Sequence, residues 1–461
     1  MISFILNNKK IETNLPSGMT VLDFVRKQQQ LTGTKIGCRE GDCGACTILV
    51  GKLQNGKLVY QNMTSCLMPL ANAQGKHIVS VEGINGKNLT PVQAAMVENG
   101  GTQCGFCTIG FVMSLTGFAL TKKGEKEAIA SIDGNICRCT GYKSIERAAA
   151  EIAHKITQKP EENTIEWLTE NEFIPAYFLT IKERLETMAS HKSKVLSSDN
   201  LHFTAGGTDL FVQKPETMAS TEIIPLFDQK TLKGIWTQGE NCYLGASTTV
   251  SEMAHSEIMH SIFPNLAQHI KLISSTPIRN MATLAGNFVN ASPIGDMTIF
   301  FLALDASIVL NKNEKRRTLK LKHFYKGYKQ LDKTTDEIIE TIFFEIPKGK
   351  YHFNFEKVSK RTHLDIATVN TACLLKFDEY NTITEAHLSA GGLAAIPTYL
   401  GKTATFLTGK KAKMEIFEKA VDILQSEVSP ISDVRGTKEY KRLLLRQLFY
   451  AHSIRQFQSA E

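Results

Sequence analysis

A group of four cysteines near the N-terminus constrains this chain more than any other feature of the sequence. Cys38, Cys43 and Cys46 are spaced C-x4-C-x2-C on a loop that contains three glycines, and Cys66 follows downstream. A loop that wraps a metal cluster must visit positive φ and aim backbone N–H groups at sulfur, which glycine does without the cost of a Cβ atom. Cysteines with this spacing are typical ligands of a 2Fe–2S cluster. The chain is therefore expected to begin with an electron carrier.

A second group of cysteines has C-x2-C and C-x-C spacing. It consists of Cys104, Cys107, Cys137 and Cys139. Each of its pairs precedes an expected helix, and helix N-terminal N–H groups and dipoles favour thiolates. A structural zinc site is the alternative on spacing alone, because C-x2-C is common to both metals. Beside the first group, a second iron–sulfur cluster is favoured.

Length and composition indicate a globular protein with several domains. A chain of 461 residues corresponds to roughly three or four domains. Hydrophobic residues make up 42% and charged residues 21% of the chain, and we find no apolar run of the roughly 18 residues that a spanning helix needs. The first ten residues read as a strand, not as a cleaved signal. We therefore expect a cytoplasmic protein without a membrane partner.

The charge and the remaining cysteines add little. The formal net charge of +7 is spread thinly, and the densest basic stretch, 438–442, contains its own Glu439. A solvated helix face explains this stretch better than a nucleic-acid partner does. Cys242 and Cys373 are isolated in apolar surroundings and are expected to pack in the core. Because no export signal precedes them, the cysteine-rich groups are expected to bind metal rather than form disulfides.

Strand and helix patterns divide the first 157 residues into two parts. Strands are expected over 2–6, 10–15, 47–53, 57–63 and 77–81, with a hairpin at Asn55-Gly56 and a helix starting at Thr20. From about 85 the pattern is helical. Helices are expected after Thr90, after Cys107, over 126–132 and over 145–156.

The rest of the chain reads as a mixture of strands and helices. The polar stretch 158–171, which carries Pro160, is expected to be a linker. The stretch 338–347 is expected to be an edge strand ending in Pro347, and a domain boundary is placed there. Beyond it, 351–377 is expected to form strands, and the tail from Lys413 is expected to be helical.

Taken together, the cysteine motifs resemble those of the xanthine dehydrogenase and aldehyde oxidase family of molybdenum hydroxylases. The similar segments read G-C-R-E-G-D-C-G-A-C, Q-C-G-F-C-T and N-I-C-R-C-T-G-Y. The resemblance implies that the first group of four cysteines holds one 2Fe–2S cluster and the second group another. It also implies that Gln103 contacts the pterin of a molybdenum cofactor held by a partner.

Two further segments resemble the flavin-binding domain of the same family. The first is F-T-A-G-G-T-D-L, and adjacent glycines let backbone N–H groups approach a pyrophosphate closely, although a plain turn is the alternative for this segment alone. The second is R-N-M-A-T-L-A-G-N followed by A-S-P-I-G-D. The FAD contacts implied by the resemblance are Phe203, Thr204, Ala205, Gly206, Gly207, Thr208, Asp209, Leu210, Thr283, Gly286, Asn287 and Asp296.

We therefore predict a multidomain α+β fold. Its expected parts are a β-grasp 2Fe–2S ferredoxin-like domain over 1–84, a four-helix 2Fe–2S bundle over 85–157, the linker over 158–171, a two-part α+β FAD domain over 172–346 and a C-terminal α+β flavoprotein domain over 347–461.

The resemblance implies the small subunit of a xanthine dehydrogenase, with no catalytic residue on this chain. Electrons from purine oxidation at molybdenum-molybdopterin on a large partner subunit would pass through both clusters to FAD and then to NAD+. Because the chain ends at Glu461, the molybdenum part is expected on that partner, in a heterotetramer of two small and two large subunits. The alternatives are a subunit of an aldehyde or N-heterocycle hydroxylase with another acceptor, and a non-enzymatic redox sensor or zinc scaffold.

Overall fold

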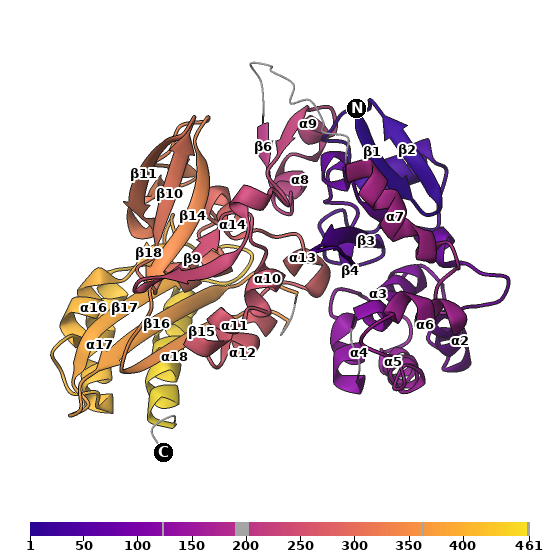
Figure 1. Cartoon of the computed structure of the whole chain (residues 1–461). Coiled ribbons are helices and arrows are strands. Elements are labelled where there is room, and N and C mark those ends of the chain that lie inside the picture. Colours follow the sequence, from indigo (N-terminus) through magenta and orange to yellow (C-terminus); the bar gives the residue numbers. More distant parts are fainter. Residues whose placement is uncertain (122–123, 190–201, 362–363, 459–461) are drawn as a thin grey trace. The chain divides into compact units, whose positions relative to one another are not determined.

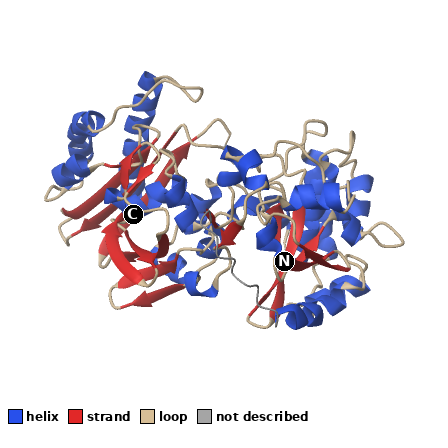
Figure 2. Ribbon diagram, turned by 90° about the horizontal axis from the view of Figure 1, so that it is seen from above, coloured by secondary structure: helices blue, strands red, loops and turns tan. Residues whose placement is uncertain are grey.

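The computed structural model describes residues 1–121, 124–189, 202–361 and 364–458 (Figure 1). These residues form two compact units. The first unit comprises Met1–Phe227 and Ser275–Ala282, and the second comprises Asp228–Ser274 and Thr283–Glu461. Strands gather into sheets with helices beside them, as the colouring of Figure 2 shows, which confirms the mixed α+β class. Across the described ranges, no helix combines the length and apolar character that crossing a bilayer requires.

The first unit is built on a five-stranded sheet in the order β2-β1-β5-β3-β4. Its strands are β1 (Ile2–Leu6), β2 (Lys9–Thr13), β3 (Thr47–Gln54), β4 (Lys57–Thr64) and β5 (His77–Val79). β1 and β5 are parallel and the other neighbours are antiparallel. The expected hairpin is present, because Asn55 and Gly56 both have positive φ (50° and 74°), as a tight turn between β3 and β4 requires.

The expected helix after Thr20 is short. Thr20 caps α1 (Val21–Asp23), accepting the N–H of Asp23 at 3.2 Å, and a π-helical turn, η1 (Phe24–Gln28), continues it. Two 3-10 turns, η2 (Leu70–Ala73) and η3 (Val81–Ile84), flank β5.

Four helices follow, as expected. They are α2 (Pro91–Glu98), α3 (Thr108–Thr121), α4 (Glu125–Ser131) and α5 (Lys143–Lys155). Thr90 and Gln93 form a reciprocal capping box at the start of α2. α3 is buried on nearly every side, which explains why its sequence is apolar without a clear period.

The stretch 158–171 differs from the expected linker. Its second half forms α6 (Thr164–Glu170), and α7 (Phe178–Ala189) follows. Leu168 of α6 is fully buried and joins the core of the helical part, together with Phe173 and Phe178. These buried apolar side chains, which are separated by polar residues in the sequence, therefore hold this stretch against the first unit.

The last elements of the first unit come from the expected FAD domain. They are β6 (His202–Thr204), α8 (Leu210–Gln213), α9 (Pro215–Ala219), β7 (Ile223–Pro225), parallel to β6, and α13 (Thr276–Arg279). Phe211, Met218 and Met281 pack into the same core as Phe4 and Leu22 of the sheet and its helix. Side-chain packing thus groups these residues with the iron–sulfur part, which the expected boundaries did not anticipate.

The second unit contains a five-stranded antiparallel sheet in the order β11-β10-β14-β9-β8. Its strands are β8 (Ile235–Gln238), β9 (Asn241–Gly245), β10 (Ser307–Lys312), β11 (Lys315–Lys320) and β14 (Ile338–Glu345). The expectation of an edge strand over 338–347 is wrong, because β14 pairs with β9 on one side and β10 on the other. Pro347 lies beyond the last paired residue and so does not interrupt the ladder.

The other elements between Asp228 and Glu345 in the second unit are short. They are η4 (Lys230–Leu232), α10 (Val250–Ala254), α11 (Glu257–Ile262), α12 (Leu266–Lys271), α14 (Leu284–Asn290), α15 (Asp296–Leu302), η5 (Leu321–His323), β12 (Tyr325–Gly327) and β13 (Gln330–Leu331).

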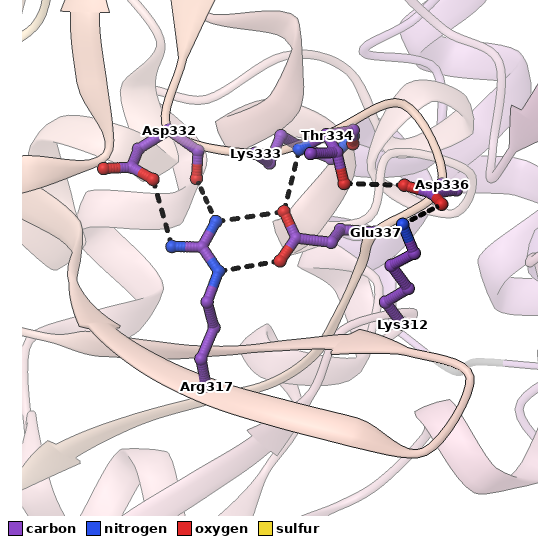
Figure 3. A network of polar contacts seen from close by, with 7 residues as sticks. All are labelled: Lys312, Arg317, Asp332, Lys333, Thr334, Asp336 and Glu337. Atoms are coloured by element: carbon purple, nitrogen blue, oxygen red, sulfur yellow. Dashed lines mark hydrogen bonds and ion pairs between the residues drawn. The ribbon is translucent and has the colours of Figure 1, made fainter.

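The edge strand β11 carries a run of basic residues that acidic residues neutralise (Figure 3). Arg317 donates to both carboxylate oxygens of Glu337 at 2.7 and 2.9 Å and to Asp332 at 3.0 Å. The bond from Arg317 lowers the pKa of Glu337 to about 2. Lys312 pairs with Asp336 at 2.5 Å. Charged side chains on an edge strand also discourage pairing with another chain.

The C-terminal part forms a four-stranded antiparallel sheet with helices, as expected. The strands are β15 (Lys350–Val358), β16 (Val369–Phe377), β17 (Ile383–Gly391) and β18 (Thr398–Tyr399), and the helices are α16 (Gly401–Leu407), α17 (Met414–Ser426) and α18 (Lys438–Gln458). Cys242 and Cys373 are fully buried, which confirms their expected place in the core.

Candidate functional site

The first cysteine group lies on a loop whose backbone N–H groups face sulfur. The N–H of Cys38 donates to Sγ of Cys43 and the N–H of Cys43 donates to Sγ of Cys38, each at 3.4 Å. The N–H of Glu40 reaches Sγ of Cys38 at 3.3 Å. Gly37 permits this closeness, because a Cβ atom there would lie 2.5 Å from Sγ of Cys43. The hydrogen bond between the two thiols lowers the pKa of Cys38 to about 5 and raises the pKa of Cys43.

Cys46 and Cys66 form the second pair of this group in the interior. They are 2% and 4% exposed. A hydrogen bond between their thiols lowers the pKa of Cys46 and raises the pKa of Cys66. Ser65 fixes the pair, since its N–H and its hydroxyl donate to the carbonyl of Cys46 at 3.2 and 2.7 Å. The structure therefore brings all four cysteines of this group together as two pairs.

The second cysteine group also consists of two pairs. Sγ of Cys104 and Sγ of Cys139 are 3.6 Å apart, and both residues are exposed. The thiols of Cys107 and Cys137 form the other pair. Burial raises the pKa of Cys107 to about 12. Burial also acts to raise the pKa of Cys137, but hydrogen bonds from Thr140 outweigh it, and the pKa of Cys137 is lowered.

Thiols arranged in pairs fit a two-iron cluster. A 2Fe–2S cluster takes four cysteines, two on each iron, whereas a structural zinc ion needs all four ligands around one point. The arrangement favours the iron–sulfur interpretation of both groups over zinc.

The two cysteine groups are joined by the backbone. The N–H of Ile136, next to Cys137, donates to the carbonyl of Cys43 at 3.0 Å. The amide of Asn135 donates to the carbonyl of Gly44 at 3.2 Å. A Cβ atom at Gly44 would lie 2.2 Å from the carbonyl oxygen of Gly134, so only glycine allows the two loops to approach this closely. A single hydrogen bond thus joins Cys43 of the first group to the residue next to Cys137 of the second.

The diglycine loop (203–210) lies against the first cysteine group within the first unit. A Cβ atom at Gly206 would lie 1.9 Å from the carbonyl oxygen of Met281. Gly207 has φ +84°, and a Cβ atom there would lie 2.8 Å from the carbonyl oxygen of Leu67, which follows Cys66. The carbonyl of Ala205 accepts a bond from Asn72 at 2.9 Å. The loop is therefore held directly beside a cysteine-bearing turn.

The diglycine loop also fits a bound FAD. Thr204 is 3% exposed, and within the described residues its buried hydroxyl has no hydrogen-bond partner. Phe203 is 38% exposed, although it is a large apolar residue. A buried hydroxyl without a partner beside two glycines is consistent with a loop that accepts a polar ligand. Thr208, Asp209 and Leu210 complete the loop and lead into α8.

The remaining expected FAD residues lie in the second unit at the starts of α14 and α15. Thr283 caps α14, accepting the N–H of Gly286 at 3.2 Å. Oδ1 of Asn287 accepts both the N–H and the hydroxyl of Thr298, at 3.0 and 3.1 Å. These two bonds fix the orientation of the Asn287 side chain.

Asp296 differs from the other expected contacts, because both of its carboxylate oxygens are already bound. Oδ2 pairs with Nζ of Lys357 at 2.7 Å, and Oδ1 accepts the amide of Asn370 at 2.6 Å. The side chain of Lys357 is only 3% exposed. In this structure Asp296 ties the start of α15 to β15 and β16. Sequence reasoning missed this role, since the three residues are far apart along the chain.

Comparison with protein families accounts for most of the chain in four successive ranges. A 2Fe-2S iron-sulfur cluster binding domain matches residues 4–71, and a [2Fe-2S] binding domain matches 80–150. An FAD binding domain in molybdopterin dehydrogenase matches 176–348, and a CO dehydrogenase flavoprotein C-terminal domain matches 355–454. The order of these domains is the order expected from the motifs.

Three longer proteins similar to this chain are named xanthine dehydrogenase. Xanthine dehydrogenase from Blastobotrys adeninivorans is 29% identical over 97% of this chain and 40% of its own length. Xanthine dehydrogenase from Emericella nidulans is 29% identical over 89% of this chain, and xanthine dehydrogenase 1 from Arabidopsis thaliana is 26% identical over 95%. The chain therefore carries two 2Fe–2S domains, an FAD-binding domain and a flavoprotein C-terminal domain, and it is similar to proteins named xanthine dehydrogenase. It spans 35–40% of the length of these relatives.

Solved structures show the same fold for part of this chain. Reconstituted CO dehydrogenase from Oligotropha carboxidovorans matches with a TM-score of 0.52 at 24% identity, covering 56% of this chain and 90% of that chain. Quinoline 2-oxidoreductase from Pseudomonas putida 86 matches with a TM-score of 0.52 at 20% identity, with the same coverage.

Gly206→Ala is expected to lower the FAD affinity of the chain by about tenfold or more. The added methyl group would collide with the Met281 carbonyl and displace the diglycine loop, so the backbone N–H groups of the loop could no longer approach the pyrophosphate closely. FAD and iron content per purified chain would be measured. Gly86→Ala, at a loop glycine with open surroundings, is the matched control. Full FAD content in Gly206→Ala would contradict the expectation.

Proposed function

We propose that the chain is the electron-transfer subunit of a xanthine dehydrogenase. In this role it passes electrons from a molybdenum cofactor on a large partner subunit through two 2Fe–2S clusters to FAD, and on to NAD+, during oxidation of hypoxanthine or xanthine. The observation that carries the proposal is the succession of close contacts within the first unit. The second cysteine group contacts the first through Ile136 and Cys43, and the first contacts the diglycine loop through Leu67 and Gly207.

The contribution of the protein is to hold and space the cofactors, which supply the redox chemistry when bound. Cys38, Cys43, Cys46 and Cys66 are proposed to hold one cluster, and Cys104, Cys107, Cys137 and Cys139 the other. Backbone N–H groups directed at sulfur, such as those of Glu40 and Thr140, stabilise the negative charge of the thiolates and so help set the reduction potentials. No residue of this chain is assigned an acid or base role.

The exposed pair of the second cysteine group supports a partner on that side. Cys104 and Cys139 are the exposed cysteines among the eight proposed ligands. Gln103, the residue proposed to face the molybdenum cofactor, donates its amide to the carbonyl of Cys139 at 3.3 Å and is exposed. We place the large subunit against this face, in a cytoplasmic heterotetramer of two small and two large subunits.

The test is NAD+-dependent oxidation of xanthine by the chain co-purified with a molybdopterin-binding partner. We expect NADH formation with xanthine or hypoxanthine, and reduced-state EPR signals from two 2Fe–2S clusters. Activity on aldehydes or N-heterocycles alone, or with oxygen or a quinone but not NAD+, would replace this function with that of a related hydroxylase. Zinc in place of iron would overturn the electron-transfer role altogether.

A further inference from the structure

The inserted segment (Ser275–Ala282) belongs to the first unit, although the residues on both sides of it in the sequence belong to the second. A segment that leaves one compact unit and returns to it must be held by specific contacts, because connections between units are otherwise mobile. Its only regular element is α13 (Thr276–Arg279), a helix of four residues. A helix this short has little stability of its own. The contacts that hold it therefore determine its position.

Asp133 supplies the polar part of these contacts. Its carboxylate accepts the N–H of Thr276 at 2.9 Å, the hydroxyl of Thr276 at 3.0 Å and Nη2 of Arg279 at 2.7 Å. The side chains of Asp133 and Arg279 are only 20% and 12% exposed. One carboxylate thus caps the start of α13 and pairs with its last residue. Charge-assisted hydrogen bonds of this kind are about twice as strong as neutral ones.

Apolar and amide contacts hold the same segment against both cysteine regions. Pro277 lies beside Gly134, where an added Cβ atom would meet its ring at 2.8 Å. Ile278 lies beside Gly41 of the first cysteine loop, where an added Cβ atom would lie 2.6 Å from the Ile278 side chain. The amide of Asn280 donates to the carbonyl of Asn62 at 2.8 Å.

Asn62 extends this contact into the helical part of the first unit. Its own amide donates to the carbonyl of Met113 in α3, at 2.8 Å. The inserted segment is therefore in contact with the first cysteine loop and the approach to the second, and is linked through Asn62 to the helix that follows Cys107.

The end of the inserted segment contacts the diglycine loop. Met281 packs in the core of the first unit, and its carbonyl oxygen lies where a Cβ atom of Gly206 would be. The hydroxyl of Thr64, two residues before Cys66, donates to Sδ of Met281 at 3.6 Å. A displacement of α13 would therefore be transmitted to the backbone against which Gly206 rests.

We propose that Asp133 is a positioning residue that locks the inserted segment onto the cysteine-bearing loops, and thereby holds the diglycine loop at a constant separation from Cys66. The expected effect of this lock, on the rate at which electrons reach FAD, rests on the proposed function. The lock itself does not depend on that function.

The test is Asp133→Asn in the full chain with its cofactors and partner. The amide retains the size of the carboxylate but loses the charge paired with Arg279. Trypsin should then cut after Arg279, giving a new N-terminus at Asn280, about tenfold or more faster than in the parent protein, since local opening exposes the bond. FAD reduction by the substrate of the partner, followed in single turnover, should slow by about tenfold, as positioning errors of about 1 Å allow.

Two further variants make the test decisive. Glu337→Gln breaks a comparable bidentate arginine pair in the second unit and should leave cleavage at Arg279 unchanged. Thr276→Val removes the hydroxyl bond to Asp133 and the bond from Arg279 to that hydroxyl, but keeps the backbone N–H bond and the charge pair. It should give cleavage at Arg279 at a rate between those of the parent and Asp133→Asn, and it serves as the test if Asp133→Asn folds poorly.

The outcomes separate the lock from its consequence. Unchanged cleavage at Arg279 in Asp133→Asn and Thr276→Val overturns the lock. Faster cleavage with unchanged FAD reduction overturns its positioning role. If the parent complex shows no FAD reduction by the substrate, the proposed function fails, and the cleavage rates still decide whether the lock exists.

Discussion

Asp296→Asn is expected to lower the free energy of unfolding of the second unit by about 3–5 kcal/mol. The substitution leaves Nζ of Lys357 without its anionic partner, and that side chain is only 3% exposed. An uncompensated buried charge costs far more than the lost attraction, because the charge remains desolvated. Asn370 would also lose a charge-assisted bond of 2.6 Å. Although the sequence motif suggested a flavin contact for Asp296, the larger effect expected here is on stability.

The measurement is urea unfolding monitored by tryptophan fluorescence. The chain contains two tryptophans, Trp167 in the first unit and Trp236 in the second. Trp167→Phe as the background leaves Trp236 as the reporter of the second unit. The matched control is Glu240→Gln, which breaks the exposed pair of Glu240 and Lys348 and should change the stability far less, because solvent screens an exposed pair. A loss no larger for Asp296→Asn than for Glu240→Gln would contradict the expected result.

The second unit should also lose stability as the pH falls from 7 to 5, because three histidines are buried in neutral form. Burial lowers the pKa of His269 and His352 to about 4 and that of His452 to about 3. Asn354 bridges two of them, contacting His269 at 3.2 Å and His452 at 2.8 Å. The cation Arg455 disfavours protonation of all three.

The sign follows from where the protons bind. Below pH 6.5 an unfolded chain protonates these histidines, while the folded chain does so only near pH 4 or below. The unfolded state therefore binds more protons in this window, and stability falls as the pH falls. Each histidine contributes at most about 1.4 kcal/mol per pH unit, a slope approached near pH 5 where the unfolded histidine is almost fully protonated, so three contribute at most roughly 4 kcal/mol per unit.

Urea unfolding at several pH values, with Trp236 as the reporter, would measure this slope. His452→Gln keeps a hydrogen-bonding side chain between Asn354 and Thr371 but cannot be protonated in this range. It should remove about a third of the slope, whatever its effect at pH 7. A slope unchanged by His452→Gln would show that acid acts elsewhere.

The sequence correctly predicted those elements that are specified by residues close together in the chain. Thr90 with Gln93 specifies a helix start, and Asn55-Gly56 specifies a hairpin, because the residues that interact are neighbours in the chain. The central position of β14 was missed, since its strand pattern and Pro347 say nothing about which strands lie on either side. α6 was missed because its anchors, such as Leu168, are sparse among polar residues.

The sequence by itself determined the two sets of cysteines and the glycines around them, because the chemistry of holding a cluster on a short loop restricts the residues and their spacing. Only the tertiary structure decided how these parts are coupled. The bond from Ile136 to Cys43, the pairing of Asp133 with Arg279 and the clamp of Lys357 on Asp296 each join residues distant in sequence. Such contacts depend on how whole elements pack, and no local pattern records them.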